Sequence, residues 1–146
     1  MATVQALLAK KGGQVVTIGV ADSALTAATL MNERGIGGLV VLDGGRVAGM
    51  FTERDILRRV VAMRRDPAAT PVSEVMTTPV AFCRLETTLS ECRAVMTEKR
   101  IRHLPVVGEK GVCGSRLFAA RRSTWASYPP QARSIASAVI CTRSRA

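Results

Sequence analysis

The hydrophobic and polar positions along the chain change their period several times, and each change predicts an element. Residues 15–20 are mostly β-branched, which predicts a short strand. Ser23 then precedes apolar residues one turn apart, so we predict an N-capped helix over Ala24–Arg34. The apolar run Gly38–Leu42 is typical of a strand buried on both faces, and a tight turn leads to a return strand at Arg46–Phe51. The predicted order is strand, helix, strand, turn, strand.

Two further helices are expected around this unit. One covers Glu53–Arg65 and ends at Asp66, because the next residue is proline. The other is a short leading helix over Thr3–Lys11, closed by a pair of glycines.

The pattern occurs twice. Residues 79–114 repeat residues 15–55, with Leu39 aligned to Leu104 and Val41 to Val106. Two copies at an offset of 64 and then 65 residues indicate two similar supersecondary units that do not bury their apolar faces alone. We therefore divide the chain into four segments: 1–65, leading helix and first copy; 66–72, linker; 73–114, a truncated second copy; and 115–146, a divergent basic tail.

Composition excludes several classes of protein. The 146 residues are 47% hydrophobic, which suits an ordinary folded core. No apolar run approaches the roughly 20 residues that span a bilayer, and no signal-peptide pattern is present, so we expect a soluble cytoplasmic protein without membrane association.

The four cysteines form no C-x-x-C pair and only one histidine exists, so we expect no metal site and reduced cysteines in the core. No nucleophile–base or carboxylate pair stands at a convincing spacing, and we expect no catalysis.

The net charge of +10 is unevenly distributed. All 11 acidic residues precede Ser115, whereas residues 115–146 contain six arginines and no acid. Such a tail is compatible with salt-dependent, sequence-independent binding of nucleic acid, an alternative function that does not explain the repeat. We therefore do not expect nucleic acid to be the main partner.

The repeated motifs resemble a known family. The stretches IGGLVVLDGGRVAGMFTERDIL and IRHLPVVGEKGVCG, preceded by SEVMTTPV, resemble the cystathionine β-synthase (CBS) domain pair, or Bateman module, over about residues 3–114. The resemblance implies an α/β (α+β) fold of tandem β-α-β-β-α motifs packed sheet to sheet with pseudo-two-fold symmetry. It also implies a regulatory, non-catalytic module that binds AMP, ADP, ATP, NAD(H) or S-adenosylmethionine in the cleft between the motifs. A flat homodimer and an unknown regulated protein are the implied partners.

The T-E-R-D sequence after the return strand carries the first candidate site. Thr52 starts a helix whose free N–H groups suit an anion, and Asp55 can accept hydrogen bonds from both ribose hydroxyls. Arg54 could pair with phosphate. The resemblance supports Thr52 and Asp55 as a ligand pair; by local sequence alone, T-x-x-D is also nearly a helix capping box, and both roles can coexist.

The turns that enter the two middle strands carry the next candidates. In the first copy, Gly37 and Gly38, preceded by Ile36, let a base or phosphate approach the backbone, although a simple helix-to-strand turn explains Gly38 equally well. In the second copy the corresponding residues include Arg102, a candidate phosphate ligand, and His103, either a second donor or a partly buried structural histidine.

The resemblance also assigns the first strand of each motif to the other motif's site. It places Val80, Ala81 and Phe82 beside Asp55, and Thr17 and Ile18 in the reciprocal cleft. Ordinary strand core is the alternative for all five.

The repeat stops abruptly after Gly114. Thr52 aligns with Leu117 and Asp55 with Ala120, so the second T-x-x-D is absent and we expect at most one competent nucleotide site. The sharp change of composition favours a reading-frame shift, with a genuine divergent tail as the alternative. In either case we expect poor order beyond Ala120 and a second copy that lacks a strand and a covering helix.

Overall fold

The structure of the protein is a computed structural model that describes residues 2–11, 15–108, 111–112 and 139–141. The chain forms two compact units. The first unit is Val16–Val80, and the second combines Met1–Val15 with Ala81–Ala146. Both contain helices and a small sheet, which confirms the predicted mixed α/β class.

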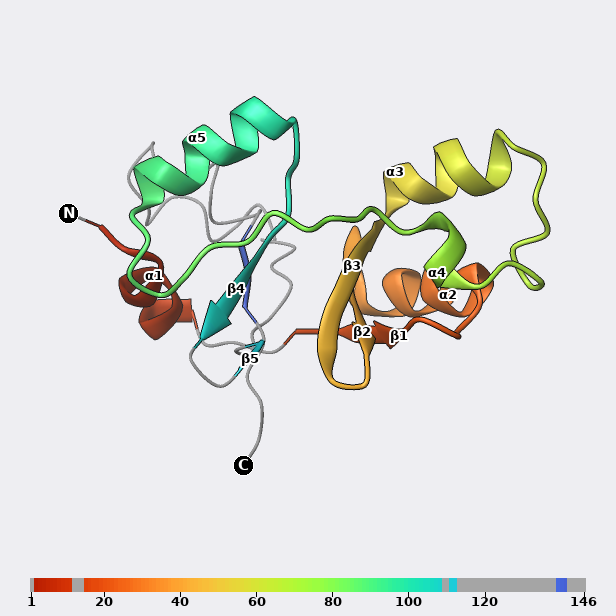
Figure 1. The fold of residues 1–146 in the computed structure, drawn as a ribbon, viewed down its shortest axis with the longest axis horizontal. Coiled ribbons are helices and arrows are strands. Elements are labelled where there is room, and N and C mark those ends of the chain that lie inside the picture. Colours follow the sequence, from red (N-terminus) through yellow and green to blue (C-terminus); the bar gives the residue numbers. More distant parts are fainter. Residues whose placement is uncertain (1, 12–14, 109–110, 113–138, 142–146) are drawn as a thin grey trace. The chain divides into compact units, whose positions relative to one another are not determined.

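The first unit contains a three-stranded sheet in the order β1-β2-β3 (Figure 1). Its strands are β1 (Thr17–Gly19), β2 (Gly38–Asp43) and β3 (Arg46–Thr52). β1 runs parallel to β2, and β2 runs antiparallel to β3. Gly44 and Gly45 form the predicted turn with φ angles of 55° and 81°, which favour glycine.

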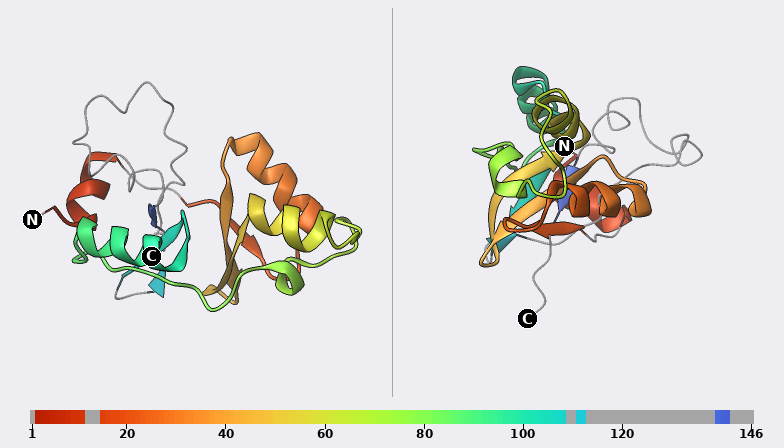
Figure 2. Two further views of the ribbon diagram at one scale, coloured as in Figure 1. Left: turned by 90° about the horizontal axis from the view of Figure 1, so that it is seen from above. Right: turned by 90° about the vertical axis from the view of Figure 1, so that its right-hand side faces the viewer.

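Helices cover one face of this sheet. α2 (Ala24–Arg34) begins and ends where the sequence predicts: the Ser23 hydroxyl accepts from the Thr26 N–H, and Gly35 closes the helix with φ of 62°. α3 (Glu53–Asp55) continues directly into η1 (Ile56–Val61), and the resulting helix lies beside α2 on the same face of the sheet (Figure 2). η1 is π-helical, and the Ala62 N–H donates to the Leu57 carbonyl at 2.9 Å. The helix therefore ends at Val61, earlier than the predicted Arg65.

The segment predicted as a linker belongs to the first unit. The Ala24 N–H donates to the Thr70 carbonyl at 2.8 Å, and α4 (Val72–Val75) buries both of its valines. Thr77 then forms an antiparallel bridge with Met50 of β3. Residues 73–80, assigned by sequence to the second copy, are therefore part of the first unit, because their apolar side chains and backbone groups complete its core and sheet.

The second unit is built around α5 (Leu89–Lys99) and β4 (Leu104–Gly108). β5 (Gly111–Val112) pairs antiparallel with β4, and β6 (Val139–Cys141) pairs parallel with it. The expected first strand of this copy is a single parallel bridge between Cys83 and Val106.

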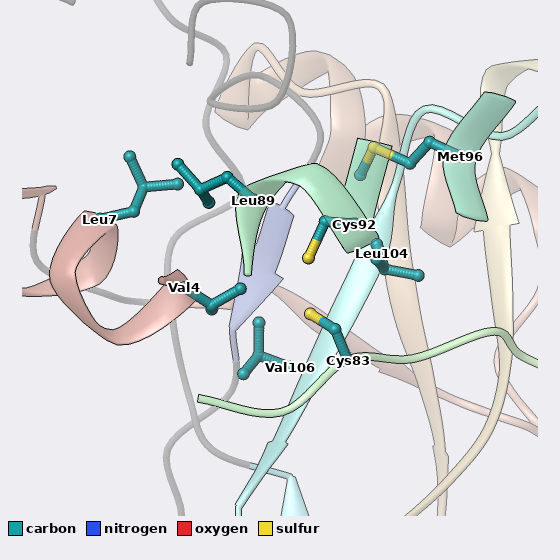
Figure 3. Packing of buried hydrophobic residues seen from close by; sticks show 8 residues of the cluster. All are labelled: Val4, Leu7, Cys83, Leu89, Cys92, Met96, Leu104 and Val106. Atoms are coloured by element: carbon teal, nitrogen blue, oxygen red, sulfur yellow. The ribbon is translucent and has the colours of Figure 1, made fainter. Parts of the chain in front are cut away.

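The leading helix packs in the second unit, although the sequence-based division grouped it with the first copy. α1 (Val4–Lys11) confirms the predicted helix, but the Val4 N–H donates to the Thr87 carbonyl at 2.9 Å. Val4 and Leu7 join one hydrophobic cluster with residues of α5, β4 and the preceding loop (Figure 3): Cys83, Leu89, Cys92, Met96, Leu104 and Val106. This cluster explains the grouping, since α1 buries its apolar side chains there.

Two of the four cysteines, Cys83 and Cys92, lie in this cluster as buried thiols outside any disulfide, as predicted. The sulfur atoms of Cys83 and Cys92 lie next to each other (Figure 3). A hydrogen bond from Cys83 lowers the pKa of the Cys92 thiol, against the effect of burial. Cys113 and the side chain of Cys141 lie outside the described residues.

The tail differs from expectation in one described segment. Val139–Cys141 form β6 and pair with residues 104–106 of β4. The other positions beyond Ala120, where poor order was expected, and the aligned positions Leu117 and Ala120 lie outside the described residues. The predicted tail therefore contributes at least one strand to the second unit.

Candidate functional site

The candidate site is built where β3 passes into α3. Thr52 is the last residue of β3 and has extended backbone angles, φ −126° and ψ 167°, as an N-cap does. Three residues later, the Asp55 Oδ2 atom accepts from the Thr52 N–H at 2.9 Å and from the Thr52 hydroxyl at 3.1 Å. Thr52 and Asp55 are therefore hydrogen-bonded to each other in the capping role that the local sequence also allowed, and their role as a ligand pair stays a prediction.

The other oxygen of Asp55 meets a distant part of the chain. Oδ1 accepts from the Thr77 hydroxyl at 2.9 Å, and the Arg59 Nε atom lies 3.7 Å from it. Asp55 is only 5% exposed, so its carboxylate is removed from water. Three hydrogen bonds and an ion pair compensate for that burial.

The glycines of the first turn lie beside this cap. Gly38 is the register partner of Thr52 in the β2–β3 ladder, and the Glu53 N–H donates to the Gly37 carbonyl at 3.1 Å. A Cβ atom on Gly37 would lie 3.2 Å from the Glu53 Oε2 atom, so the turn and the helix start are closely apposed. The structure therefore brings the turn and the helix start together. Ile36 is buried, and Arg54 is exposed on the first turn of α3.

The remaining candidates of the first unit lie in its strands and at its end. Thr17 pairs with Val40, and Ile18 pairs with Val41 and is buried. Ile18 thus has the strand-core role given above as the alternative. Val80 is half-buried and is the last residue of the first unit.

The second unit contains the other four candidates. Ala81 is half-buried against the hydrophobic cluster, whereas Phe82 is 53% exposed. Arg102 is exposed and His103 half-buried, both between α5 and β4. Their assignment to a cleft shared with Asp55 stays a prediction.

Two contacts of Asp55 were not anticipated from the sequence. Arg59 stands four residues after Asp55 on the same helix, a spacing that favours ion pairs and could have revealed it. No comparable signal marks Thr77, which is 22 residues away and reaches Asp55 only through the fold.

Other kinds of site find no support in the described part of the chain. It contains no group of three or more His, Cys, Asp or Glu residues placed to hold a metal ion. Within the same residues, no helix has the length and apolarity to cross a membrane. The arginine-rich tail, on which nucleic-acid binding would depend, lies outside the described residues apart from Val139–Cys141.

Comparison with known proteins identifies the class. The family model of the CBS domain matches residues 10–62 and 72–115, and the chain therefore belongs to the CBS domain family, whose members are generally regulatory modules. The resemblance noted in the sequence is confirmed.

Individual relatives agree with this assignment. The CBS domain-containing protein YhcV of Bacillus subtilis is 36% identical over 101 residues, which are 69% of this chain and 71% of that protein. The crystal structure of the CBS domain NE2398 is 40% identical, with a TM-score of 0.73, and covers 77% of this chain and 87% of its own. A hexameric CBS-CP12 protein from bloom-forming cyanobacteria is 29% identical, with a TM-score of 0.67, over 77% of this chain and 61% of its own.

Proposed function

We propose that this CBS-domain protein is a non-catalytic sensor that binds an adenine ligand at Asp55. AMP, ATP, NAD(H) and S-adenosylmethionine are the candidate ligands. The observation that carries the proposal is the cap at the start of α3, where a buried carboxylate lies beside the Gly37–Gly38 turn. In dinucleotide-binding folds a carboxylate binds the ribose and glycines let the phosphates approach the backbone, and this likeness supports the proposal.

The roles of the residues follow from their chemistry. Asp55 accepts hydrogen bonds from the ribose hydroxyls, and Gly37 and Gly38 let the ligand approach the backbone. Arg54 is the nearest cation in sequence for a phosphate, and Arg102 and His103 are additional donors from the second copy. Val80, Ala81 and Phe82 supply apolar surface to the base, while Thr17 and Ile18 serve the reciprocal cleft.

The test is calorimetric titration of the full chain with each candidate ligand. We expect at least one to bind, and Asp55→Asn to weaken it at least tenfold, because about 1.5–3 kcal/mol is typical of a hydrogen bond to a charged group. Glu91→Gln is the matched control, since Glu91 caps α5 through Thr88 in the same way. Failure of every ligand to bind, or equal binding by Asp55→Asn, would contradict the proposal.

We further propose that the protein acts as a cytoplasmic homodimer that passes the ligand signal to a separate regulated protein. Support comes from η1, where Leu57 is 62% and Val61 61% exposed, one turn apart. Native mass spectrometry should report a dimer for the wild type and a monomer for Leu57→Glu. Retention of the dimer by that variant would exclude this face of η1 as the contact.

A further inference from the structure

Asp55 cannot receive a ribose diol in the arrangement that the structure describes. A carboxylate offers about four lone-pair positions. Three are taken by hydrogen bonds from Thr52 and Thr77, and the Arg59 guanidinium faces Oδ1. Two ribose hydroxyls need two positions, so at least one protein donor must leave before both can bind.

Thr77 is the donor that lies outside the start of α3, so its hydroxyl can leave Asp55 without any change at the helix start. Both bonds from Thr52 are local, and one of them caps the N-terminal backbone of α3. The Thr77 hydroxyl instead belongs to a separate segment and donates to the oxygen that Thr52 does not use. A ribose hydroxyl is chemically equivalent to it, so the exchange replaces one hydroxyl donor with another.

The segment that carries Thr77 is held tightly against β3. The Thr77 N–H donates to the Met50 carbonyl at 2.7 Å, and the Met50 N–H donates to the Thr77 carbonyl at 3.0 Å. The Met76 carbonyl also accepts from Arg59 Nη1 at 2.6 Å. There is no room for a side chain at Gly49, because a Cβ atom there would lie 2.6 Å from the Met76 sulfur and 3.0 Å from the Thr77 carbonyl oxygen.

This segment also leads into one of the two places where the chain passes from one unit to the other. The first unit ends at Val80, three residues beyond Thr77, and the chain then enters the second unit at Ala81. Arg59 contacts both Asp55 in the site and the Met76 carbonyl in this segment. The Asp55 carboxylate is therefore linked to the segment that leads to Val80 through two side chains, Thr77 and Arg59.

We propose that Thr77 is an internal competitor of the ligand: its hydroxyl occupies Asp55 until a ribose hydroxyl replaces it, and this exchange loosens the connection between the units. The inference rests on the proposed binding of an adenine ligand at Asp55. It adds the route by which binding at the site alters the rest of the protein.

The first test compares Thr77→Val with the wild type. Valine keeps the shape and the backbone bridge but cannot donate to Asp55. In calorimetric titrations with AMP, ATP, NAD(H) and S-adenosylmethionine, we expect the ligand that binds the wild type to bind Thr77→Val about fivefold more tightly, the value of one ordinary hydrogen bond. Thr70→Val is the control, because the buried Thr70 hydroxyl donates to the Asp66 carbonyl, away from Asp55. Its affinity should equal that of the wild type.

The second test measures the connection itself. Amide hydrogen exchange at Met50 and Thr77 should accelerate when the bound ligand is added to the wild type. Gly49→Ala keeps residues 55 and 77 but displaces the segment that carries Thr77. It should accelerate hydrogen exchange at the Met50 and Thr77 amides without ligand and also tighten ligand binding.

The outcomes separate the two proposals. If the wild type binds a ligand but Thr77→Val binds it equally or more weakly, or the two amides stay protected, Thr77 is not a competitor and only this inference fails. If no variant and no wild-type protein binds any of the ligands, the proposed function itself fails and this inference falls with it.

Discussion

The two copies of the repeat complete their cores in the same way, but each uses the segment that precedes the other copy. In the first unit, the Val72 N–H donates to the Asp22 carbonyl and the Ala24 N–H to the Thr70 carbonyl. In the second unit, the corresponding bonds run from Val4 to Thr87 and from Leu89 to Ala2. The leading segments are therefore exchanged between copies.

The copies differ on the C-terminal side of the middle strand. β2 pairs with β3 over Gly38–Asp43, and β3 delivers Thr52 and Asp55 to the candidate site. In the part of the second copy that the structure describes, β5 pairs with only Val107 and Gly108, and β6 pairs with residues 104–106. A shared repeat thus produces two similar cores, while the residues that follow the last position shared by the copies decide which copy has a carboxylate at the position of Asp55.

The largest expected effect comes from the equivalent leucines of the two middle strands. Leu39 and Leu104 are both fully buried. Replacing either with alanine should lower the free energy of unfolding by about 2–5 kcal/mol, because it leaves a cavity in a packed core. Urea titration followed by circular dichroism measures this, with the half-exposed Leu25→Ala as control. A loss below about 1 kcal/mol for Leu104→Ala would show that the second core is not packed as described.

The exchange of leading segments is tested by a second matched pair. Val4 and Val72 are both fully buried, so each change to alanine should remove about 2 kcal/mol of stability. Hydrogen exchange should then accelerate in α5 and β4 for Val4→Ala, but in α2 and β2 for Val72→Ala. The reverse pattern would contradict the exchange, because it would show that each leading segment stabilises the copy that follows it in sequence. Gln5→Ala, an exposed change on α1, is the control.

A smaller effect distinguishes the two helix ends. Gly35 ends α2 with φ of 62°, whereas Arg100 ends α5 in the same left-handed region with φ of 53°. Glycine adopts this conformation without strain, so Arg100→Gly should raise stability by about 0.5–1 kcal/mol and Gly35→Ala should lower it by a similar amount. Thermal unfolding of both variants checks the sign; destabilisation by Arg100→Gly would mean that contacts of the arginine side chain outweigh the backbone strain.

The smallest effect is a pH dependence at the α5 cap. Hydrogen bonds from the Thr88 N–H and hydroxyl hold the pKa of Glu91 below its ordinary value of 4.5. A carboxylate with a lowered folded-state pKa contributes stability above its unfolded pKa and loses it as the pH falls through the folded pKa. The difference in Tm between the wild type and Glu91→Gln should therefore be greater at pH 6 than at pH 3. A difference independent of pH would exclude an ionic contribution from this cap.

Much of the fold was predictable because it depends on neighbours in sequence. The cap at Ser23, the end of α2 at Arg34 and the tight turn at Gly44–Gly45 each act over two to four residues, and the structure has them as predicted. The Thr52–Asp55 pair belongs to the same category, which is why its capping role was visible in the local sequence, whereas its candidate ligand role came from the family resemblance.

By itself, the sequence determined the repeat, the order of strand, helix, strand and strand in the first copy, and the residues that begin and end α2, since propensity, capping and turn geometry are local. Only the tertiary structure decided that α1 covers the second copy, that α4 covers the first, and that Thr77 meets Asp55. Hydrophobic burial has no direction along the chain, so a short apolar helix does not encode which core it will cover. A hydrogen bond between residues 22 positions apart exists only once that packing has brought their segments together.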